Sequence, residues 1–168
     1  DTGGSVRIPA AWNDLVGLKT TIGRLSVAGS VPLIPNFDTI GPLCRSVEDA
    51  LNLLKILEGK EVSNFQKVEF KSLKLMILKT GTFNDIHPQV DQGFARVVDL
   101  LKKNDVSVDS RHIEEVNEVQ EIGFDLMSAG SYGIWQKEIE KSPELMFPEI
   151  LSRFRSGKDV LAVDLSLI

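Results

Sequence analysis

The chain has 168 residues, of which 42% are hydrophobic and 26% charged, and its net charge is −5, as in an ordinary globular protein. The acidic balance argues against nucleic-acid binding through phosphate neutralisation, and no apolar run approaches the roughly 20 residues that span a bilayer. A single cysteine, Cys44, excludes an internal disulfide framework and suits a reducing compartment, so we expect a cytoplasmic protein. One cysteine and two histidines make no convincing metal site.

Residues 1–45 are expected to be rich in loops, because they hold six of the thirteen glycines and four of the seven prolines. Short strands such as Val16–Lys19 are expected among them. The segment opens on "DTGGSVRIPA", in which two glycines precede Ser5 and allow the backbone to approach a ligand closely. A stretch with so many residues suited to a ligand site rarely stands at a true chain terminus, where chains fray. We therefore expect an internal slice of a larger protein, incomplete at both ends.

The stretch "RSVEDALNLLKILEG" predicts a helix. Ser46 is a suitable N-cap, Asp49 follows it at capping-box spacing, and Gly59 is a suitable C-terminal stop. An apolar stripe at helical spacing indicates one buried face; its members are Val47, Ala50, Leu54 and Leu57.

The later sequence predicts a βα unit followed by helices. The almost continuous apolar run at 73–79 is typical of a strand buried on both faces. Pro88 stands at the first turn of a helix with apolar residues at helical spacing, and "NDVSVDS" predicts the next strand. This order indicates a mixed or parallel sheet. Helices are also expected over 114–140 and 149–155.

Ser5 is the best candidate for a nucleophile, but its immediate surroundings do not identify the chemistry. Arg7 replaces the second glycine of a G-x-S-x-G elbow, and no lysine completes a phosphate-binding loop. His87 precedes a proline and His112 lies in a polar stretch, so both are expected to be turn or surface residues. A Gly-Gly-Ser turn alone is more often structural than catalytic.

The longer context carries a specific resemblance. The run "DTGGSVRIPAAWNDLVGLKTTIGRLS", continued by "FDTIGPLCRSVEDA", closely resembles the amidase signature family of Ser-Ser-Lys amide hydrolases. The match covers residues 1–59 nearly continuously, and residues 73–168 resemble the α/β region that follows the signature. The matching positions include Arg7, Pro9, Ala10, Gly17, Lys19, Gly23, Arg24, Gly41, Pro42, Arg45, Glu48 and Asp49. Thr20 departs from the family, in which most members have proline there.

The resemblance implies roles for the opening residues. Ser5 aligns with the nucleophile that forms an acyl-enzyme, and Asp1 and Arg7 align with a supporting pair beside it. The backbone N–H groups of Thr2, Gly3, Gly4 and Ser5 align with the oxyanion hole. The family's lysine base and bridging serine lie N-terminal to this segment; Lys19 is not that lysine, and the fragment alone is expected to be inactive.

The expected fold is α/β, a mixed β-sheet core with helices on both faces, and residues 1–168 are expected to be one internal segment of a single domain. The expected activity is hydrolysis of a small-molecule, non-peptide amide with release of ammonia or an amine, without metal or cofactor. Two alternatives remain open: the glutaminase component of a tRNA-dependent amidotransferase, which usually has Gln where Ile8 stands, and a non-catalytic scaffold. We expect no nucleic-acid or membrane partner and keep a homodimer as a candidate assembly.

Large apolar side chains could line a substrate pocket, but core packing is the expectation for them. They are Trp12, Phe37, Met127, Tyr132 and Trp135.

Overall fold

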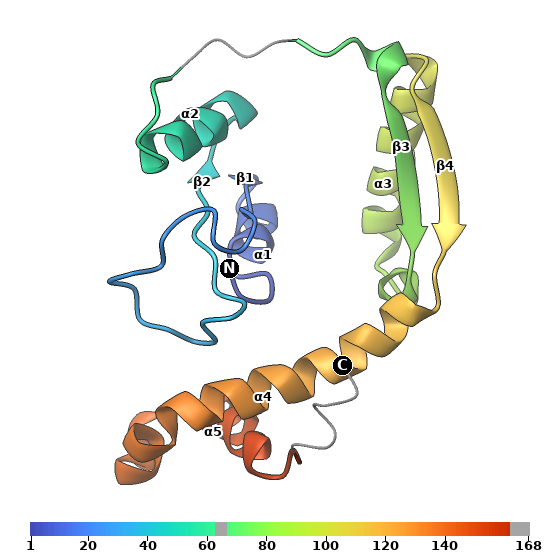
Figure 1. Cartoon of the computed structure of the whole chain (residues 1–168). Coiled ribbons are helices and arrows are strands. Elements are labelled where there is room, and N and C mark those ends of the chain that lie inside the picture. The colour runs from blue at the N-terminus through green and yellow to red at the C-terminus, as the bar shows by residue number, and fades with distance from the viewer. Residues whose placement is uncertain (63–66, 162–168) are drawn as a thin grey trace. The chain divides into compact units, whose positions relative to one another are not determined.

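The computed structural model describes residues 1–62 and 67–161 (Figure 1). The chain divides into two compact units, Asp1–Asn64 with Asp125–Ile168 and, between them in sequence, Phe65–Phe124. The helices and strands are α1 (Arg7–Trp12), β1 (Val16–Gly17), β2 (Leu43–Cys44), α2 (Val47–Leu57), β3 (Lys74–Lys79), α3 (Pro88–Lys103), β4 (Ser107–His112), α4 (Glu115–Lys141) and α5 (Pro148–Arg155). Helix α4 runs from the second unit into the first.

In the first unit, β1 and β2 pair antiparallel, with Val16 opposite Cys44 and Gly17 opposite Leu43. Two glycines permit the tight packing around this pair. A Cβ on Gly17 would lie 2.7 Å from the Ala10 Cβ of α1, and one on Gly41 would collide with the Leu18 carbonyl oxygen. The pair therefore lies against α1, which directly follows the turn that carries Ser5.

Helix α2 begins and ends where the sequence predicts. The Ser46 hydroxyl accepts a hydrogen bond from the Asp49 N–H at 3.0 Å, and Gly59 follows the helix with a φ of +67°. Ala50 and Leu54 are buried, but Val47 is 62% exposed, so the predicted apolar stripe is only half covered in the described chain.

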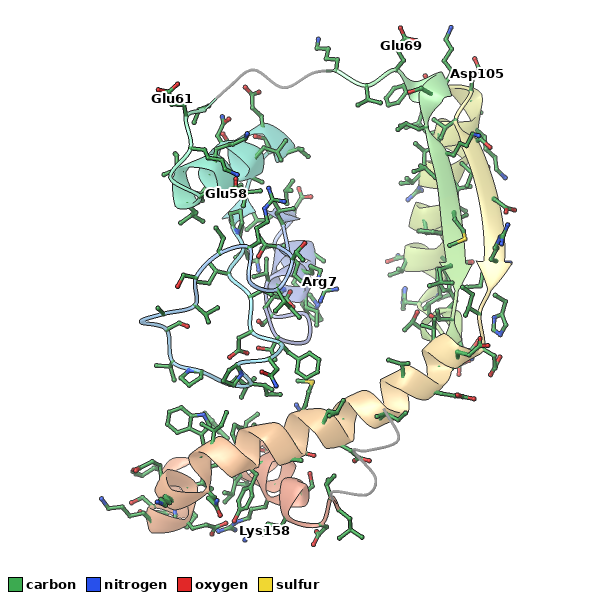
Figure 2. The ribbon with its side chains drawn as sticks, in the orientation of Figure 1. Arg7, Glu58, Glu61, Glu69, Asp105 and Lys158 are labelled. Carbon is green, nitrogen blue, oxygen red and sulfur yellow. The ribbon has the colours of Figure 1, made fainter. Side chains whose placement is uncertain are left out.

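Helices α4 and α5 are joined by a polar cluster around Glu140. Its carboxylate accepts hydrogen bonds from Arg155 Nη2 at 2.7 Å and Nε at 3.1 Å, and from the Tyr132 hydroxyl at 3.1 Å. The ammonium of Lys158 (labelled in Figure 2) lies 2.9 Å from Glu140 Oε1. It also stands over the Tyr132 ring, 5.2 Å from the ring centroid. Hydrogen bonds from Arg155 and then Lys158 lower the pKa of Glu140 to about 2.

We expect Glu140→Gln to lower the melting temperature at neutral pH and to flatten its pH dependence in acid. A carboxylate with a lowered pKa stabilises the fold fully above its ordinary pKa of 4.5, and this contribution is lost as the pH falls toward about 2. The difference in melting temperature between parent and variant should therefore be constant above pH 5 and shrink below it. Glu144→Gln, at an exposed glutamate of the same unit, is the matched control. A difference that stays constant down to pH 2 would contradict this role.

The second unit is a β–α–β crossover, as the sequence predicts. Strands β3 and β4 pair in parallel from Lys74 opposite Ser107 to Lys79 opposite His112, and α3 connects them (Figure 1). The strand at 74–79 is confirmed, but its burial on both faces is wrong for the described chain: Leu75 is 39% and Met76 52% exposed. A two-stranded sheet with one helix cannot cover both of its faces.

The predicted combination of helices and sheet is confirmed. In the described ranges the strands form two separate two-stranded sheets rather than one mixed sheet. Within residues 1–62 and 67–161, no helix has the length and apolar character needed to cross a membrane. The expected single domain stays a prediction.

Candidate active site

Ser5 lies on a turn directly before α1. Its neighbours Gly4 and Val6 are buried, whereas Ser5 itself is exposed. Gly4 has a φ of +129°, which side chains of L-residues rarely adopt, and its carbonyl accepts a hydrogen bond from the Ile8 N–H at 2.7 Å. The turn therefore presents the Ser5 hydroxyl outward while the backbone on either side is held inside.

The Asp1 carboxylate holds this turn together. Its side chain is 0% exposed and accepts hydrogen bonds from the Gly4 N–H at 2.8 Å and the Val6 N–H at 3.1 Å. Arg7 (labelled in Figure 2) completes the arrangement with two hydrogen bonds of 3.1 Å from Nε and Nη2. Buried carboxylates need such compensation, and bidentate pairing to arginine is its strongest form. Asp1 and Arg7 thus form an ion pair, and their role in supporting a nucleophile at Ser5 stays a prediction.

The four N–H groups expected to form an oxyanion hole differ in availability. The Gly4 N–H is engaged by the Asp1 carboxylate. Within the described part of the chain, the N–H groups of Thr2, Gly3 and Ser5 donate no hydrogen bond. Of the four expected oxyanion donors, three N–H groups are therefore free among the described residues. The fourth, that of Gly4, instead holds the turn through its hydrogen bond to Asp1.

A second loop is attached to the first two residues. The Thr39 N–H and hydroxyl donate to the Asp1 carbonyl at 3.0 and 2.7 Å, and the Thr2 hydroxyl donates to Asp38 Oδ1 at 2.5 Å. Sequence reasoning used Asp38 and Thr39 only as part of the family match. The signal that could have drawn attention to them is the Asp-Thr pair at 38–39, which repeats the Asp-Thr pair at the opening.

The Asp38 carboxylate also orders its own loop, accepting from the Leu33 N–H at 2.9 Å and the Ile34 N–H at 3.0 Å. Burial raises the pKa of Asp38, but the hydrogen bonds from Thr2, Ile34 and Leu33 together outweigh it and hold this pKa below its ordinary 3.8. Asp38 is therefore ionised at neutral pH.

The two histidines have local roles in the second unit. His87 Nδ1 accepts from the Gln89 N–H at 3.3 Å and so caps α3, and His112 Nε2 lies 2.6 Å from Glu114 Oε2. Both side chains are exposed, which confirms the prediction of turn and surface residues.

The expectation of core packing for the large apolar side chains is wrong for Trp12, which is 86% exposed, and for Phe37, which is 39% exposed. Trp135 of α4 packs against the loop at 31–34 and donates from its indole N–H to the Pro32 carbonyl at 2.8 Å. Met127, also of α4, lies against the segment that carries Ser5: its Cε is 3.2 Å from where a Gly3 Cβ would stand.

The chain is similar to several known proteins. An indoleacetamide hydrolase of Allorhizobium ampelinum is 35% identical over 119 residues, which cover 71% of this chain and 25% of that protein. A glutamyl-tRNA(Gln) amidotransferase subunit from Methanococcus vannielii is 36% identical over 111 residues, 60% of this chain and 26% of that protein. A crystal structure of an amidase superimposes with a TM-score of 0.85 at 29% identity, over 98% of this chain and 37% of that one.

The chain thus spans about a quarter of the length of these two curated relatives. A family model described as Amidase matches residues 1–161, which include the turn that carries Ser5, the loop that holds it and the helices that follow. On this match the resemblance read from the sequence is confirmed, and the chain belongs to the amidase family.

Proposed function

We propose that the full-length protein hydrolyses amides through Ser5. The observation that carries this proposal is an exposed serine on a turn that a buried, arginine-paired carboxylate fixes beside free backbone N–H groups. Ser5 Oγ attacks the amide carbonyl carbon, and ammonia or an amine leaves with a proton as the acyl-enzyme forms. Water then cleaves the ester, releasing the carboxylic acid and returning the proton to Ser5.

The negative charge of each tetrahedral intermediate needs donors that are in place beforehand. We assign this role to the N–H groups of Thr2, Gly3 and Ser5, because fixed backbone donors can stabilise an oxyanion by about 3 kcal/mol each. Gly4 contributes through the conformation of the turn, since its N–H binds Asp1.

The general base in this proposal is a lysine that acts through a bridging serine. The family resemblance implies that both residues lie N-terminal to this segment in the full-length protein. Lys19 is exposed and its ammonium donates to the Thr20 carbonyl at 2.7 Å, which suits a structural position. In this scheme the reaction requires no metal or cofactor. We also keep the cytoplasm as the proposed location, on the single cysteine; the homodimer stays a prediction.

The similarity to the amidotransferase subunit from Methanococcus vannielii supports the glutaminase alternative. Ile8, which stands where such subunits usually have glutamine, argues against it. Ammonia release from indoleacetamide and from glutamine separates the two activities, since the first relative's name refers to the former substrate. The scaffold alternative requires that neither substrate is turned over and that the paired serine and lysine are missing from the full-length sequence.

The proposal is tested by covalent labelling of the full-length protein with a fluorophosphonate probe. We expect stoichiometric modification at Ser5, located by mass spectrometry of the peptide, because the activated nucleophile attacks the electrophilic phosphorus. Ser30→Ala is the matched control, since Ser30 is an exposed turn serine of the same unit. Labelling that survives in Ser5→Ala, or a parent protein that is never labelled, would overturn the assignment.

A further inference from the structure

Two consecutive residues of one loop hold the first two residues of the nucleophile segment. Thr39 binds the Asp1 carbonyl through both its N–H and its hydroxyl. The Asp38 carboxylate accepts a hydrogen bond from the Thr2 hydroxyl at 2.5 Å. These contacts join positions 36 to 38 residues apart in the sequence. The nucleophile segment is therefore fixed from outside the turn as well as by its own Asp1 carboxylate.

The loop that holds Thr2 is itself well anchored. Asp38 binds the N–H groups of Leu33 and Ile34, and Ile34 is buried at 6% exposure. The Ile34 side chain reaches α4, where its Cγ2 is 3.3 Å from the position of a Gly130 Cβ. A hydrogen bond to Asp38 thus connects Thr2 to the helical framework rather than to a free loop.

The hydrogen bonds constrain the two peptide groups that carry candidate oxyanion donors. Thr39 fixes the plane of the Asp1–Thr2 peptide, which carries the Thr2 N–H. Asp38 fixes the Cα–Cβ bond of Thr2, so only ψ of Thr2 still sets the direction of the Gly3 N–H. Because its charge is compensated by three donors, Asp38 can restrain this backbone without facing a developing oxyanion as a bare negative charge.

We propose that Asp38 and the Thr2 hydroxyl are positioning residues for amide hydrolysis, which aim the N–H groups of Thr2 and Gly3 at the carbonyl oxygen. The inference rests on the proposed function of Ser5. Neither side chain reacts with the substrate; each acts by holding the backbone donors, and a displacement of about 1 Å in such a group can cost about 100-fold in rate.

Thr2→Val and Thr2→Ser form the decisive pair of variants in the full-length protein. Valine keeps the shape of threonine and removes the hydroxyl, whereas serine keeps the hydroxyl. We expect Thr2→Val to lower kcat about 30-fold with KM changed less than about twofold, and Thr2→Ser to retain kcat within about threefold. If the Thr2 hydroxyl only stabilised the fold, the folded fraction of Thr2→Val would have the same kcat as the parent protein.

Asp38→Asn completes a double-mutant cycle, because the amide cannot accept all of the hydrogen bonds that the carboxylate accepts. If the two residues act as one unit, Thr2→Val should lower kcat less than about threefold further in the Asp38→Asn background. Full, independent losses in the two variants, or parent kcat in Thr2→Val, would overturn the inference. If Asp38→Asn does not fold, the Thr2 pair still decides.

Fluorophosphonate labelling of the same proteins separates the positioning role from the proposed function. A parent protein that is not labelled at Ser5 contradicts the proposed function. A parent that is labelled and active, beside a Thr2→Val variant with unchanged kcat, contradicts only the positioning role of Asp38 and Thr2.

Discussion

Ser5→Ala in the full-length protein is expected to lower kcat for amide hydrolysis by about 10⁴-fold or more while leaving the melting temperature within a few degrees of the parent. The side chain is exposed, and its hydroxyl has no hydrogen-bond partner among the residues that the structure describes. Its removal therefore costs little packing, whereas the covalent step is lost completely. Steady-state ammonia release and thermal unfolding of one preparation measure both quantities.

Ser30→Ala controls for the loss of a serine hydroxyl elsewhere in the unit, since the Ser30 hydroxyl donates to the Val27 carbonyl at 2.6 Å within its own turn. It should keep the parent kcat. A Ser5→Ala preparation that retained about a tenth of the parent kcat, with contaminating amidases excluded, would show that another group is the nucleophile.

Gly4→Ala is expected to lower kcat about 100-fold and to reduce the free energy of unfolding by about 1–3 kcal/mol. A side chain at this φ of +129° is strained, and its Cβ would lie 2.7 Å from Ile8 Cδ1. The turn must shift to relieve both effects, and Ser5 shifts with it. Comparing kcat with the free energy of unfolding in denaturant separates loss of geometry from loss of folded protein.

The double variant Gly4→Ala/Ile8→Ala distinguishes the two causes. It removes the contact with Ile8 but leaves the backbone strain, so stability should recover in part while kcat stays low. Gly3→Ala is a milder comparison, because Gly3 lacks a positive φ and its added Cβ would meet only the flexible end of Met127. Parent kcat in folded Gly4→Ala would mean that the glycine serves stability alone.

Local elements were predictable where independent signals coincide. Ser46, Asp49 and Gly59 delimit α2 by capping and by a left-handed stop, and Pro88 starts α3 at the position that its missing N–H favours. The exposure of Leu75 and of Met76 was not predictable from their own segment, because burial of a strand depends on what covers the sheet.

The candidate site was predictable only in part. Ser5 and the Asp1–Arg7 pair came from the match to a known family, and the geometry adds that Gly4 donates its N–H to Asp1. The attachment of Thr2 to Asp38 joins residues 36 positions apart, and neither propensity nor periodicity carries information about such a distant side-chain contact. The contact between Thr2 and Asp38 could therefore be recognised only from the three-dimensional structure.

The first unit is assembled from two stretches of sequence separated by the whole of Phe65–Phe124. On a ribosome, Met127 emerges about 120 residues after Gly3, which takes about 6–25 s at ordinary rates of synthesis. During this delay the segment that carries Ser5 lacks its contact with α4, whereas β3, α3 and β4 have all been made and the two strands can pair with each other. The nascent chain should therefore complete the crossover first and acquire an ordered turn at Ser5 only after α4 has been made.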